Sequence, residues 1–120
     1  METLLHHIKH QPETLSFKTV IDTINQHYDF SPTAFTNGLG KETLHNAQGK
    51  NEGSCRVFAF AQRHALSEAE VLACFGEHYR LDVLQHPEGD DHQNIRNFMK
   101  YGWQGIQFET NALTEKCVNA

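Results

Sequence analysis

A cysteine at the start of an apolar segment is the first candidate for chemistry. Cys55 follows the polar run 51–54 and precedes a stretch rich in Phe, Val and Ala. A thiol in the first turn of a helix lies at the positive end of the helix dipole, which lowers its pKa and makes thiolate available. His78 or His92 can supply the imidazole that a Cys–His pair requires. The alternative is structural: the run 51–54 caps the helix, and Cys55 is a small core residue, as free cysteines usually are.

The densest polar segment of the chain is 89–97, GDDHQNIRN. On a helix His92 and Arg96 share a face, and Asp90 or Asp91 lies at the electropositive N-terminus. Such a group can bind an anion, orient a water or hold a metal through Asp and His. The alternative is that one Asp caps the helix while Arg96 pairs with another carboxylate, such as Asp82. Capping needs only one of these residues, so the segment predicts a binding or catalytic role.

Two versions of a functional site follow from these segments. As a binding surface, the site consists of the polar residues of both runs: Asn51, Glu52, Asp90, Asp91, His92, Asn94 and Arg96. As a small enzyme, the chain uses Cys55 as an activated thiol or His92 as a general base that Asp90 or Asp91 orients. Every part of the enzyme version has a structural explanation, so we favour the binding surface. The sequence assigns no cofactor and no metal ligand.

Two further histidine groups are weaker signals. Helical spacing places His78 beside Asp82, which makes a carboxylate–imidazole pair, although such i,i+4 pairs are common on helix surfaces. His6, His7 and His10 can chelate a metal adventitiously, but no carboxylate completes a known ligand spacing.

The elements that must position these residues predict an α+β fold, mostly helical, with a small antiparallel sheet or hairpin. Apolar spacing predicts four to five helices: at 2–10, at 17–28 after an N-cap at Ser16, from 54 onward, at 71–83 after the capping box Ser67–Glu70, and from 91 to Gly102. Short extended segments are predicted at 33–37 and 105–109, as antiparallel partners, with a further strand near 44–48 inside the loop 38–53. The tail 110–120 is polar, and we expect it to fray.

Composition limits the class of protein. The 120 residues carry a net charge of -5, whereas a nucleic-acid-binding protein normally shows a basic face. No apolar stretch approaches the roughly 20 residues of a membrane span. Three cysteines without a CxxC pair indicate neither a disulfide framework nor a zinc site, which favours a reducing cytoplasm. We therefore expect one domain over 1–120, with a core at about 16–109, and no nucleic-acid or membrane partner.

Four runs together resemble the HopJ family of type III effectors: FSPTAFTNG at 30–38, NEGSCRVFAFA at 51–61, FGEHYRLDVLQHP at 75–87 and GDDHQNIRNFMKYGWQGIQF at 89–108. The resemblance implies an effector that is secreted into a host cell, but it brings no catalytic residues with it. A type III signal is usually disordered and Ser-rich, whereas residues 2–28 have a helical pattern and contain only Ser16. The partner is therefore expected to be a protein, a host protein if the chain is secreted, or a small anionic ligand.

Overall fold

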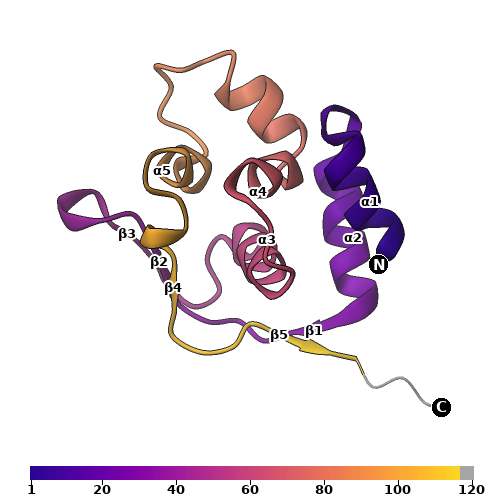
Figure 1. The fold of residues 1–120 in the computed structure, drawn as a ribbon. Helices are drawn as coiled ribbons and strands as arrows, with labels where there is room; N and C mark the ends of the chain where they lie inside the picture. The colour runs from indigo at the N-terminus through magenta and orange to yellow at the C-terminus, as the bar shows by residue number, and fades with distance from the viewer. Residues whose placement is uncertain (117–120) are drawn as a thin grey trace.

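The computed structural model describes residues 1–116 and shows a mostly helical α+β domain (Figure 1). The α-helices in this part of the chain are α1 (Glu2–His10), α2 (Phe17–His27), α3 (Glu52–Arg63), α4 (Glu68–Cys74) and α5 (Gln93–Tyr101). The strands are β1 (Tyr28–Phe30), β2 (Phe35–Asn37), β3 (Leu44–Asn46), β4 (Gln107–Phe108) and β5 (Leu113–Glu115). The predicted fold class is confirmed.

Helix α3 lies in the middle of the helices, with α1 and α2 on one side and α5 on the other (Figure 1). Its residue Phe58 is fully buried, and its ring lies within 6.0 Å, between centroids, of the rings of Phe35, Phe75 and Phe98. These rings come from β2, from the end of α4 and from α5. One aromatic cluster therefore joins the sheet to three helices, which accounts for the apolar run that the sequence places after Cys55.

The main sheet has the strand order β3-β2-β4, and both pairs are antiparallel. Phe35 lies opposite Phe108, which confirms the predicted pairing of the segments at 33–37 and 105–109. The strand expected near 44–48 is also present, as β3. These strands run along one edge of the helical layer, and the chain passes from β3 to the start of α3 (Figure 1).

A second, two-stranded sheet was not predicted. Strand β1 begins at Tyr28, directly after α2, and pairs with β5. The prediction of a frayed tail is wrong up to Glu115, because Ala112 and Leu113 are buried and β5 extends the fold. The last four residues of the predicted tail, 117–120, lie outside the described residues. Pairing with a distant strand overrides the polar character of the segment.

The continuous helix predicted at 71–83 is also wrong, because the structure divides it. Helix α4 ends at Cys74, Gly76 adopts φ +58°, and a π-helix follows at His78–Val83. A Cβ atom on Gly76 would lie 2.5 Å from the backbone nitrogen of Phe17. The chain therefore turns where glycine permits both the left-handed conformation and close contact with the start of α2.

The predicted helix starts are confirmed at two places. The Ser16 side chain accepts a hydrogen bond from the Thr19 backbone N–H, and Ser67 and Glu70 form a reciprocal capping box. None of the helices in residues 1–116 combines the length and the apolar character needed to cross a membrane.

Candidate functional site

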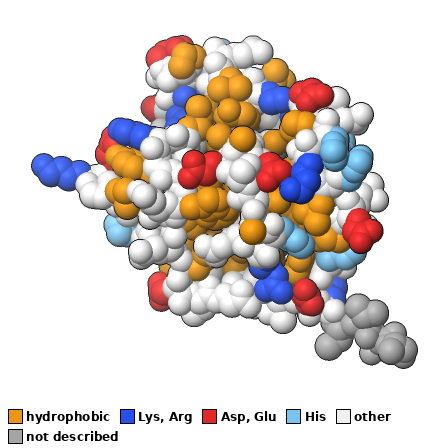
Figure 2. Space-filling model, viewed as in Figure 1, with side chains coloured by type: hydrophobic (Ala, Val, Ile, Leu, Met, Phe, Trp, Pro, Cys, Tyr) orange, Lys and Arg blue, Asp and Glu red, His pale blue; other side chains and the backbone are white. Residues whose placement is uncertain are grey.

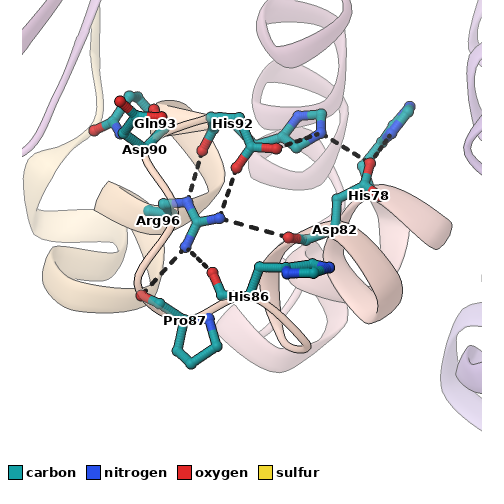
Figure 3. Close-up of polar contacts among 9 residues, drawn as sticks. His78, Asp82, His86, Pro87, Asp90, His92, Gln93 and Arg96 are labelled. Atoms are coloured by element: carbon teal, nitrogen blue, oxygen red, sulfur yellow. Dashed lines mark hydrogen bonds and ion pairs between the residues drawn. The ribbon is translucent and has the colours of Figure 1, made fainter.

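Two separate polar segments meet at Asp82. Its Oδ2 atom lies 3.0 Å from Nε2 of His92 and 3.4 Å from Nδ1 of His78 (Figure 3). We call these three residues the His–Asp–His cluster. Hydrogen bonds from His92 and then from His78 hold the pKa of Asp82 below its ordinary value. All three side chains are partly exposed, so the cluster is accessible to solvent and solutes.

The π-helix that carries His78 and Asp82 is fastened to the start of α2. The Glu77 carboxylate accepts a hydrogen bond of 2.8 Å from the Phe17 backbone N–H, and Arg80 donates one of 2.7 Å to the Leu15 carbonyl. The His78 ring packs edge-on against Phe17 at 4.8 Å. π-Helical turns are rare and occur frequently at functional sites, where they place side chains that a regular helix would not.

The loop that carries His92 is held by Arg96. Its guanidinium donates to the Asp91 carboxylate at 2.7 Å, to the Asp91 carbonyl at 2.6 Å and to the His86 carbonyl at 2.9 Å (Figure 3). The ion pair lowers the pKa of Asp91, chiefly through the hydrogen bond from Arg96. Only 14% of the Arg96 side chain is exposed. Arg96 therefore folds the loop and has few donors left for a ligand.

A cleft of about 530 Å³ opens beside the His–Asp–His cluster. Its apolar wall is formed by Phe17, Leu44, Phe75 and Ile95. Its polar lining consists of three imidazoles, four amides and a hydroxyl, from His45, His78, His92, Asn46, Asn51, Gln93, Asn94 and Ser54. Within residues 1–116 no carboxylate side chain lines this cleft. Its lining therefore offers hydrogen-bond donors without a fixed negative charge.

The N-termini of α3 and α5 both point their first residues at this cleft. The N-cap residues Asn51 and His92 adopt left-handed conformations, with φ 53° and φ 50°. In the described part of the chain, neither side chain accepts a hydrogen bond from the first turn of its helix. N-cap residues ordinarily have extended backbones and satisfy these N–H groups. Two positive helix ends thus share one cleft.

Asparagine side chains build the wall between β3 and α5. Asn94 donates to Asn46 Oδ1 at 2.9 Å and accepts from Asn37 Nδ2 at 3.0 Å, and Asn51 donates to Asn46 Oδ1 at 2.6 Å. Asn37, Asn46 and Asn94 are buried. We call these four residues the asparagine network. The bond to Asn46 orients the Asn51 side chain toward the network, and this side chain does not cap α3.

Cys55 lies away from this chemistry. Its side chain is 1% exposed, and its Sγ atom lies 4.0 Å from the carbonyl oxygen of Thr33. Burial raises the pKa of the thiol to about 11. A thiol in this environment is protonated at neutral pH and is not a nucleophile. The geometry therefore argues against Cys55 as an activated thiol, and helix position alone does not decide cysteine reactivity.

The structure divides the sequence-predicted residues into three groups. Asn51, His92 and Asn94 line the cleft. Asp90 and Asp91 line a separate depression together with Asp82 and His86. Arg96 is committed to the loop, and Glu52 does not line the cleft.

Sequence reasoning missed His45, Asn46 and Gln93 in the cleft. It also assigned the wrong carboxylate to His92, since Asp82 is its nearest partner and Asp91 Oδ2 lies 4.0 Å away. The useful signal was the i,i+4 spacing of His78 and Asp82, which does place the two side chains in contact. Only the turn through 84–91 brings His92 to the same carboxylate.

Charge is mixed over one face of the molecule (Figure 2). On the face shown in Figure 2, Lys and Arg side chains alternate with Asp and Glu, and no large basic patch forms. This mixed distribution on the face shown agrees with the net charge of -5.

Comparisons with known proteins agree with this structure. The chain superimposes on the crystal structure of a protein of unknown function, VPA0580, with a TM-score of 0.92 and 51% sequence identity, over 97% of this chain and 93% of that one. A comparison with curated proteins finds no match. The family model described as HopJ type III effector protein matches residues 1–113. The chain therefore belongs to the HopJ type III effector protein family.

Proposed function

We propose that this chain is a binding module whose cleft holds a small anionic ligand or an anionic group of a partner protein. The observation that carries the proposal is the convergence of two helix N-termini, α3 and α5, on one cleft without their own side-chain caps. Backbone N–H groups at a helix start bind anions well, because the dipole adds to the hydrogen bonds.

The lining supports the same class of ligand. Three imidazoles and several amides surround the space, and the lining within residues 1–116 contains no Asp or Glu that would repel an anion. Phe17 and Phe75 supply an apolar wall against which a carbon skeleton can pack. A small organic anion, with one carboxylate or phosphate and an apolar body, fits this lining best.

Backbone amide shifts test the proposal directly. Inorganic phosphate and malonate, titrated separately, are expected to give saturable NMR shifts at the backbone amides of Gly53, Ser54, Gln93 and Asn94. Ser54→Asp places a carboxylate in the first turn of α3, where it is compatible with the helix but competes with the anion. We expect it to weaken binding at least tenfold.

Gln62→Glu is the matched control, because it adds the same charge at the exposed far end of α3. It should leave the titration unchanged. The proposal fails if neither anion gives saturable shifts at these amides, or if Ser54→Asp binds as well as the unchanged chain.

A general-base role of His92 is the second candidate. Its imidazole lies 3.0 Å from the Asp82 carboxylate, and such a contact orients a catalytic histidine. This candidate requires that a bound ligand is chemically converted and that His92→Gln abolishes the conversion while binding persists. The first candidate requires binding alone.

Family membership supports the further proposal that type III secretion delivers the chain into a host cell. Its partner there would be a host protein. A reporter fused to the chain should then reach host cells from a strain with a working secretion system and not from one without it. Delivery from neither strain would contradict this route and favour a cytoplasmic role.

A further inference from the structure

We propose that the His–Asp–His cluster binds a divalent transition-metal ion through one nitrogen of His78, one nitrogen of His92 and a carboxylate oxygen of Asp82. The candidate ligand atoms of the three residues all lie within 4.8 Å of one another. Two of the three separations, 3.0 and 3.4 Å, are already close to the value of about 3.3 Å that tetrahedral ligands at zinc bond lengths require.

The donor set defines the class of ion. Two imidazoles and one carboxylate suit Zn²⁺ and other first-row divalent ions, whereas Ca²⁺ and Mg²⁺ prefer oxygen ligands. Three protein ligands leave at least one coordination position for water or another ligand, which is the pattern of reactive rather than structural zinc sites. His78 and His92 both line the cleft, so such a position can face it.

The supports of the cluster favour a prepared site over a chance contact. His78 is held by Phe17, and its π-helix is tied to the start of α2 through Glu77. His92 is set by its left-handed backbone and by the loop that Arg96 braces. The two imidazole rings lie 5.0 Å apart, between centroids. Two of the three ligand separations are therefore in place before an ion binds, which keeps the free-energy cost of organising the site low.

Zinc titration of untagged protein, in a buffer that does not coordinate metals, tests the inference. We expect one equivalent of Zn²⁺ to bind and Co²⁺ to give visible absorption bands from the same site. Asp82→Asn and His92→Gln should each weaken zinc binding at least tenfold, since each removes a ligand. Both residues are partly exposed, so we expect the variants to fold, and circular dichroism and urea unfolding check this.

Two control variants separate this site from other histidines. The triple variant His6→Gln, His7→Gln and His10→Gln removes the adventitious N-terminal group, and His45→Gln removes a cleft imidazole outside the cluster. Both should bind one equivalent with unchanged affinity. The inference is overturned if Asp82→Asn binds zinc as well as the unchanged chain, if no zinc binds, or if the N-terminal triple variant abolishes binding.

This inference does not rest on the proposed anion binding, because the probe is the metal alone. Loss of zinc binding in Asp82→Asn, with phosphate shifts absent throughout, would support the metal site and reject the anion cleft.

Discussion

The Cys55 thiol shows how its surroundings outweigh its position in a helix. It lies in the first turns of α3, where the dipole alone would favour thiolate, yet burial raises its pKa to about 11. With Cys74→Ala and Cys117→Ala in place, we expect native Cys55 to resist alkylation between pH 7 and 9 and to react only as the protein unfolds. Mass spectrometry measures the fraction of Cys55 that is alkylated as a function of time and of urea concentration.

The same protein in urea, where Cys55 must react at the rate of a free thiol, is the control for that experiment. Rapid modification of the folded protein with an apparent pKa below about 8.5 would contradict the buried position and restore the thiol as a nucleophile.

At the scale of elements, Gly76 separates α4 from the π-helix that carries His78 and Asp82. Gly76→Ala should lower the free energy of unfolding by roughly 2 kcal/mol more than Gly40→Ala. Both glycines have nearly the same φ, +58° and +60°, but a Cβ meets the Phe17 backbone at 2.5 Å in the first and nothing within 4 Å in the second. Urea unfolding of both variants isolates the steric contribution.

Equal losses of stability in the two alanine variants would mean that close contact with Phe17 is unimportant there. If the prediction holds, zinc affinity should also fall in Gly76→Ala, because the strain acts on the segment that positions His78.

The elements that sequence predicted well are those that local residues determine. The Ser16 cap and the Ser67–Glu70 capping box involve side chains three residues apart, so their spacing was sufficient. The break at Gly76 was missed because its reason lies at Phe17, about 60 positions away. The same applies to the site: spacing predicted the contact of His78 with Asp82, but nothing local indicated that His92 would share the carboxylate.

At the scale of the whole molecule, β5 contributes to the core despite its polar sequence. Leu113 is fully buried, and Arg63 of α3 donates to its carbonyl oxygen. Leu113→Ala should reduce the free energy of unfolding by about 2–5 kcal/mol, as expected when a buried Leu is truncated. Thr114→Ala, on the exposed face of the same strand, should change it by no more than about 0.5 kcal/mol.

Thermal or urea unfolding monitored by circular dichroism gives both values. Equal free energies of unfolding for Leu113→Ala and Thr114→Ala would show that β5 adds little to stability. That result would support the frayed tail that the composition predicts.

The pairing of β1 with β5 also has a consequence for the order of folding. Phe30 lies opposite Leu113, so this sheet closes a loop that contains most of the protein. Closing so large a loop has a high entropic cost unless the intervening helices have already collapsed. The sheet should therefore form late, after the aromatic cluster around Phe58, and the fold cannot be complete during synthesis until β5 has left the ribosome.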